Sequence, residues 1–173
     1  LYTEIDLRGT DHTLSWRFPD NPSVWATSGI IIGSSGTGKT TLVLQWIHEA
    51  LKRRPKRKFI YVSPELHQDE TLKKTLNNRR WGKYFEGIDV SDEGFEEWQK
   101  ENDGGTPDMW WDTSIKKRLL SADPGTSIIL DDAPDSSVHR HLQKFLTKYL
   151  RTGRHRKVGV FSIQHLVRGH KWT

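Results

Sequence analysis

The chain of 173 residues has the length of one globular domain, and its lack of cysteine excludes disulfide frameworks and thiolate metal sites. Only 34% of the residues are hydrophobic, yet eight Trp, six Phe and four Tyr argue against a disordered chain. The net charge is +5, no apolar run approaches the ~20 residues of a membrane helix, and the N-terminus lacks the blocks of a signal peptide. We therefore expect a soluble intracellular protein without membrane insertion, folded as a single domain over residues 1–173.

Four short apolar runs predict β-strands. They follow an N-terminal extension, residues 1–25, for which we expect a hairpin packed on the core. Each run is continuously apolar rather than alternating, which is typical of strands buried on both faces of a parallel sheet. The predicted strands are residues 29–32, 59–62, 127–130 and 158–163.

Two amphipathic helices are predicted between these strands. The first has an apolar stripe of Val43, Trp46, Ile47, Ala50 and Leu51. The second has a stripe of Val138, Leu142, Phe145, Leu146, Tyr149 and Leu150. Strands that alternate with such helices predict an α/β fold with a doubly wound parallel sheet.

Residues 65–126 are less regular and are predicted to be an elaborated crossover rather than a second domain. We expect a helix over residues 65–80, a turn-rich acidic stretch that ends near residue 108, and a short helix over residues 110–122. Trp110 and Trp111 are predicted to be buried in this crossover, with stacking on an adenine or packing on a partner subunit as the alternative.

The run "GSSGTGKT" lies between the first predicted strand and the first predicted helix and matches G-x-x-x-x-G-K-[ST], the phosphate-binding P-loop. Glycines allow the backbone N–H groups to wrap a phosphate, and the helix that follows points its positive end at the anion. Lys39 is expected to bridge β- and γ-phosphate oxygens, and the Thr40 hydroxyl to hold Mg²⁺. The predicted nucleotide-binding residues are Gly33, Ser34, Ser35, Gly36, Thr37, Gly38, Lys39, Thr40 and Thr41.

Polar residues follow two other predicted strands, at the sheet edge where open α/β folds bind ligands. Asp131 is expected to contact Mg²⁺ through its water shell, and Asp132 to orient and polarise the attacking water. The alternative for this pair is an N-cap of the next helix. Gln164 follows the last strand and is predicted to sense the γ-phosphate, with an ordinary polar strand end as the alternative.

Basic residues are concentrated in two runs, residues 52–58 and 146–157, whereas residues 85–103 are acidic. A basic face attracts nucleic acid through its phosphates. The alternative for either run is a solvated helix end or loop.

Five segments, in their order and spacing, resemble those of the poxvirus-type genome-packaging ATPases of the FtsK–HerA superfamily. The element "GRHR", a hydrophobic strand and a glutamine discriminates best, because Walker motifs are shared by many families. The resemblance implies a RecA-like core of the ASCE division and ATP hydrolysis that drives double-stranded DNA into a preformed capsid. The segments are "GSSGTGKTTL", "FIYVSPE", "SIILDDAPD", "TGRHRKVGVFSIQH" and "VRG".

The resemblance also implies a homomeric ring, a capsid vertex as partner, and a location in the host cytoplasm, at the virus assembly site or in the virion. A ring ATPase uses an arginine from the neighbouring subunit to stabilise transition-state charge. Arg154 is the first candidate, followed by Arg156 and Arg168, with a solvated basic turn or a phosphate-backbone contact as the alternative for each. Lys39, Thr40, Asp131, Asp132 and Gln164 take the family's catalytic and metal positions.

The chain ends soon after the fourth predicted strand, where the family core continues through at least one more strand. We expect either a trimmed chain or a relative that lacks the C-terminal part. Two other functions stay open. One is a small-molecule P-loop kinase with an arginine-rich lid, and the other is a nucleotide-gated DNA-binding or assembly protein with negligible turnover.

Overall fold

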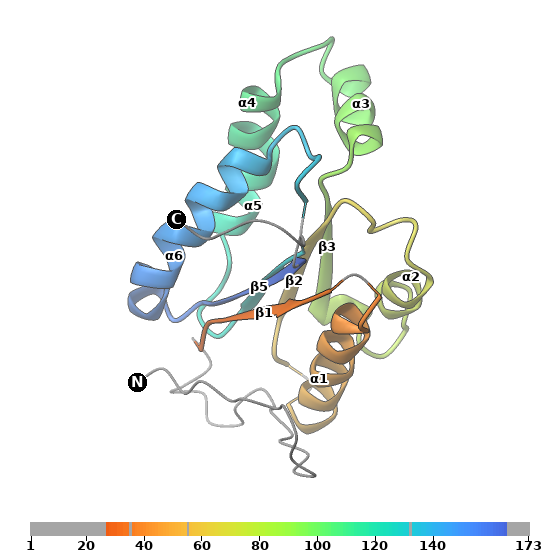
Figure 1. The fold of residues 1–173 in the computed structure, drawn as a ribbon, viewed down its shortest axis with the longest axis vertical. Coiled ribbons are helices and arrows are strands. Elements are labelled where there is room, and N and C mark those ends of the chain that lie inside the picture. Colours follow the sequence, from red (N-terminus) through yellow and green to blue (C-terminus); the bar gives the residue numbers. More distant parts are fainter. Residues whose placement is uncertain (1–26, 35, 55, 132, 166–173) are drawn as a thin grey trace.

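The computed structural model describes residues 27–165, except positions 35, 55 and 132 and the side chain of Arg154. Five parallel strands form one sheet in the order β1-β5-β4-β2-β3 (Figure 1). The strands are β1 (Gly29–Gly33), β2 (Phe59–Ser63), β3 (Phe85–Asp89), β4 (Ser127–Leu130) and β5 (Gly159–His165). The helices are α1 (Lys39–Arg53), α2 (Glu70–Leu76), α3 (Asp92–Glu101), α4 (Pro107–Trp110), α5 (Lys116–Leu120) and α6 (His139–Arg156). The predicted α/β class is confirmed.

Helices cover both faces of the sheet because each strand presents alternate side chains to opposite sides. On one face, α1 and α2 pack on residues such as Phe59, Tyr61 and Ile129. On the other, α4, α5 and α6 pack on residues such as Ile60 and Ile128 (Figure 1). All four predicted strands and both predicted helices are therefore present. Strands β2 and β4 are buried from both sides, as their continuous apolar character predicts, whereas β1 exposes Ile30 and Ile32 on one face.

Trp110 and Trp111 are buried in the second of these faces, as predicted, with 4% and 6% of their surface exposed. The backbone between α4 and α5 forms a π-helical turn over Trp111–Ile115. The predicted helix over residues 110–122 is thus a continuous helical segment from Pro107 to Leu120 with this turn inside it.

The crossover contains two elements that the sequence did not predict. The stretch expected to be turns holds β3, which pairs in parallel with β2 at the edge of the sheet, and α3, whose N-cap Ser91 accepts the Gly94 N–H at 3.0 Å. The helix predicted over residues 65–80 is also shorter, since α2 begins only after Asp69, whose carboxylate accepts the backbone N–H groups of Thr71 and Leu72. Residues 65–69 form turns instead.

The hairpin predicted for residues 1–25 lies outside the described residues. Among the helices that the structure does describe, none is long and apolar enough to span a bilayer. Because β5 lies between β1 and β4, one strand separates the P-loop from Asp131. This strand order sets the geometry of the functional site.

Candidate nucleotide-phosphate site

The glycine-rich loop between β1 and α1 has the backbone conformation that phosphate wrapping needs. Gly36 and Gly38 adopt φ values of 74° and 78°, a left-handed region that other residues enter at a cost of roughly 1–2 kcal/mol. Gly38 forms the N-cap of α1 without any side-chain cap, so the helix starts with unshielded N–H groups that face the loop. The arrangement suits a bound phosphate.

Lys39, the first residue of α1, is 7% exposed and lies across the mouth of the loop. Its ammonium group donates to the carbonyl oxygens of Gly33 at 2.9 Å and Ser34 at 2.7 Å. An ammonium has three N–H donors, so one remains for a phosphate oxygen. The Thr37 hydroxyl donates to the Ser34 carbonyl at 2.8 Å, which closes the turn from the other side.

Asp131 follows β4 and faces the loop, held by residues of the neighbouring strand β2. Its Oδ2 accepts hydrogen bonds from the Tyr61 hydroxyl at 3.1 Å and the Ser63 hydroxyl at 3.4 Å. Burial, together with the Asp131 carboxylate, raises the pKa of the Tyr61 phenol far above its ordinary value, and a hydrogen bond with Thr40 partly opposes the rise. The phenol therefore stays protonated and donates to Asp131 at any physiological pH.

Lys39, Ser63 and Asp131 line one pocket of about 340 Å³ at the carboxyl edge of the sheet, whereas Tyr61 supports Asp131 from behind it. It brings together the loop, the Thr40 hydroxyl and the Asp131 carboxylate, a donor set that fits a triphosphate tail with one Mg²⁺. Its lining residues are Gly36, Gly38, Lys39, Thr40, Thr41, Ser63, Glu65, Asp131 and His165. The sequence motifs had not assigned Tyr61, Ser63, Glu65 or His165 to the site.

Gln164 lies at the carboxyl end of β5, as predicted, but its side chain is on the other face of the sheet. It donates to the Ser162 hydroxyl at 3.3 Å and borders a small hollow beside α6 with His139 and Asp131. Strand alternation explains this, because Gln164 shares its face with Val160, whereas His165 shares its face with Ile163 and lines the phosphate pocket.

Of the candidate arginines, two lie on elements that the structure describes. Arg154 and Arg156 belong to the last turn of α6 rather than to the basic turn considered from sequence. The Arg156 guanidinium donates to the Tyr149 hydroxyl and, at 2.9 Å, to the Leu120 carbonyl. An arginine that acts on a neighbouring subunit need not lie near its own pocket, so the trans role stays a prediction. Asp132, Ser35 and Arg168 are outside the described residues.

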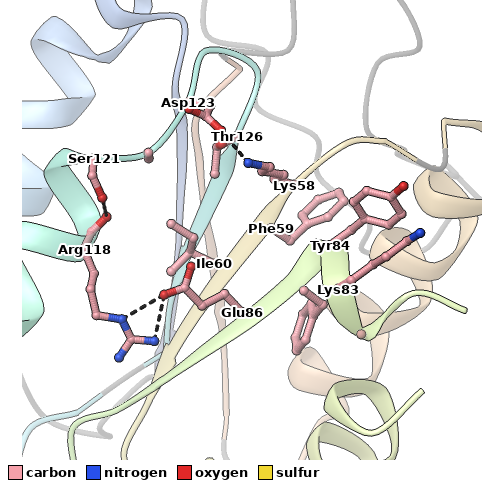
Figure 2. Close-up of a pocket in the computed structure, with 13 residues that line it drawn as sticks. Lys58, Phe59, Ile60, Lys83, Tyr84, Glu86, Arg118, Ser121, Asp123 and Thr126 are labelled. Carbon is pink, nitrogen blue, oxygen red and sulfur yellow. Dashed lines mark hydrogen bonds and ion pairs between the residues drawn. The ribbon is translucent and has the colours of Figure 1, made fainter. Parts of the chain in front are cut away.

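A larger hollow of about 540 Å³ lies at the opposite edge of the sheet (Figure 2). Both of its carboxylates are paired with cations, Asp123 with Lys58 and Glu86 with Arg118. Its remaining cation, Lys83, lies over the Tyr84 ring. It contains none of the P-loop residues. The phosphate chemistry therefore belongs to the smaller pocket.

The parallel strand order, the glycine loop between β1 and α1, and the carboxylate after β4 define an α/β P-loop NTPase fold. No model of a known protein family matches this chain, and a search of curated proteins likewise finds no match.

Solved structures with a similar arrangement include ATPases 2 and 3 of Thermomonospora curvata EccC in complex with a signal sequence peptide, at 14% identity and a TM-score of 0.44. Another is the genome packaging NTPase B204 of Sulfolobus turreted icosahedral virus 2 in complex with ATP-γS, at 16% identity and a TM-score of 0.41. The similarity covers 81% and 85% of this chain, but only 25% of the EccC chain and 66% of the B204 chain. The fold assignment rests on the strand order and the loop described above.

Proposed function

We propose that this protein hydrolyses ATP to move double-stranded viral DNA into a preformed capsid, as a homomeric ring at the capsid vertex. The observation that carries the proposal is a phosphate pocket combined, in one domain, with a long cationic helix surface. The motif order that resembles poxvirus-type packaging ATPases supports the same function.

The pocket supplies the groups that ATP binding needs. Lys39 and the loop N–H groups would hold the phosphate oxygens, and Thr40 and Asp131 are the residues that would hold Mg²⁺. A bound Mg²⁺ would neutralise part of the charge of the phosphate tail. Asp132 remains the sequence-based candidate for the carboxylate that activates water, and Gln164 the sequence-based candidate for the sensor of the γ-phosphate.

Helix α6 supplies the DNA-binding surface. Its 18 residues include six Lys or Arg and no Asp or Glu. One face packs into the core through residues such as Phe145 and Tyr149. The exposed face carries cations at helical spacing, and within the described residues none of them is paired with a carboxylate. These residues, which we call the α6 cationic face, are Arg140, Lys144, Lys148 and Arg151.

A row of unpaired cations on a rigid helix matches the phosphate backbone of DNA and reads no bases. Binding is therefore expected to be independent of sequence and to weaken steeply with salt, because each phosphate contact releases counterions. The other basic run, residues 52–58, is a less suitable DNA-binding surface, because two of its cations, Lys52 and Arg53, pair with Glu49.

Duplex DNA binding by fluorescence anisotropy, measured over a series of salt concentrations, tests this part of the proposal. The double variant Lys144→Glu/Lys148→Glu should bind DNA more weakly. The plot of the log of its association constant against the log of salt concentration should be less steep, by about 0.9 for each DNA phosphate that is no longer neutralised. The control Lys74→Glu/Lys100→Glu makes the same change in net charge at exposed positions on α2 and α3. Equal loss of binding in both variants, or a wild type whose binding does not respond to salt, would contradict a DNA surface on α6.

A further inference from the structure

The phosphate pocket contains a second carboxylate, that of Glu65, which follows β2 by two positions. It lines the same pocket as Lys39 and Asp131. The residue is exposed, and within the described part of the chain its carboxylate takes part in no ion pair or hydrogen bond. In the hollow at the opposite edge, by contrast, both carboxylates are paired with cations (Figure 2).

The backbone of Glu65 is held firmly although its side chain is unpaired. Its N–H donates to the Ser63 hydroxyl at 3.1 Å, and its carbonyl oxygen accepts the N–H groups of Gln68 at 3.0 Å and Asp69 at 2.9 Å. The same Ser63 hydroxyl donates to Asp131 Oδ2. One serine thus links the positions of the two carboxylates.

The two carboxylates are suited to different tasks. Asp131 already accepts two hydroxyl donors on Oδ2, from Tyr61 and Ser63, which fixes its orientation and uses lone pairs of that oxygen. Glu65 has both oxygens available to accept a proton from water. It is also one methylene longer, and it reaches the pocket from β2, the strand next to the Asp131 strand.

We propose that Glu65 is the catalytic residue that accepts the proton of the attacking water, an inference that rests on the proposed ATP hydrolysis. The water oxygen forms a bond to the γ-phosphorus while the bond from that phosphorus to the β–γ bridging oxygen breaks. ADP leaves with the bonding electron pair. The water proton passes to a Glu65 carboxylate oxygen and then to the released phosphate or to solvent. Ser63 positions both carboxylates, because its hydroxyl donates to Asp131 and accepts the backbone N–H of Glu65.

The test compares the wild type with Glu65→Gln, Asp132→Asn and the control Glu97→Gln, which changes an exposed glutamate on α3 outside the pocket. Phosphate release is measured across pH, and the affinity for a non-hydrolysable ATP analogue is measured separately. We expect Glu65→Gln to lower turnover by about 100-fold or more, to abolish the acidic limb of the pH profile and to leave analogue affinity unchanged. Glu97→Gln should behave as wild type.

Turnover by Glu65→Gln at the wild-type rate, with loss in Asp132→Asn, would overturn the inference and assign the step to Asp132. Loss of analogue affinity in Glu65→Gln in parallel with turnover would also overturn it, because Glu65 would then be a binding residue. A wild type that hydrolyses ATP without any response to DNA, with Glu65→Gln inactive, supports Glu65 and contradicts only the motor. A wild type without hydrolysis contradicts both.

Discussion

The hydrogen bond from Tyr61 to Asp131 makes the most specific prediction about the site. Tyr61→Phe removes only the hydroxyl, which donates to Asp131 Oδ2 at 3.1 Å from a fully buried ring, and it leaves the packing of that ring intact. Hydrogen bonds to charged groups contribute about 1.5–3 kcal/mol to stability. We expect the free energy of unfolding to fall by that amount, which for a chain of this size lowers the melting temperature by about 3–12 °C.

Urea unfolding of both proteins measures this difference, with an unchanged slope as evidence that the folded state is otherwise intact. Tyr84→Phe is the matched control, because the Tyr84 hydroxyl makes no hydrogen bond within the described residues and its ring lies beneath Lys83. The stabilisation by Mg-ATP should also be smaller in Tyr61→Phe, since Asp131 Oδ2 loses the Tyr61 hydroxyl as a donor. If Tyr61→Phe unfolds at the same urea concentration as Tyr84→Phe, the phenol does not tether Asp131.

Three further predictions concern the loop, the core and one helix cap. Gly38→Ala and Gly104→Ala both place a side chain at positive φ, in open space, so each should cost about 1–2 kcal/mol of stability, but only Gly38→Ala should weaken ATP binding in a titration. Ile128→Ala should destabilise the fold by about 2–5 kcal/mol in urea unfolding, whereas Ile30→Ala, at a residue 49% exposed, should cost far less. Ser91→Ala should cost about 1 kcal/mol, since the hydroxyl caps α3, and a variant as stable as wild type would contradict that cap.

The parts of the fold that could be predicted are those with strong local patterns. Apolar runs predicted four strands, although only the inner strands are buried on both faces and β1 exposes Ile30 and Ile32. Apolar stripes predicted α1 and α6 because each helix covers one face of the sheet. Strand β3 could not be predicted in this way. It lies at the edge of the sheet, and Glu86 and Gly87 interrupt its apolar residues. The Ser91 cap and the acidic turn after it were the available signal for α3.

The candidate site shows a different limit. The P-loop motif predicted Lys39 and Thr40 because its residues are contiguous, and the apolar run before Asp131 predicted that residue at the sheet edge. The place of Glu65 in the pocket depends on the pairing of β2 with β4, which brings the ends of these two strands together. This pairing cannot be read from local sequence patterns. Successive side chains of a strand point to opposite faces of the sheet, so a shift of one residue changes which side chain enters the pocket. His165 therefore lines the pocket and Gln164 does not.

The most direct test of the proposed function is ATP hydrolysis by the full chain with Mg²⁺, measured with and without linear duplex DNA, beside the P-loop variant Lys39→Ala. The proposal predicts turnover that rises with DNA of any sequence and is absent in the variant. Phosphate transfer to a nucleoside in place of water would indicate a kinase. Tight ATP binding without turnover, with or without DNA, would contradict a motor and indicate a nucleotide-gated switch.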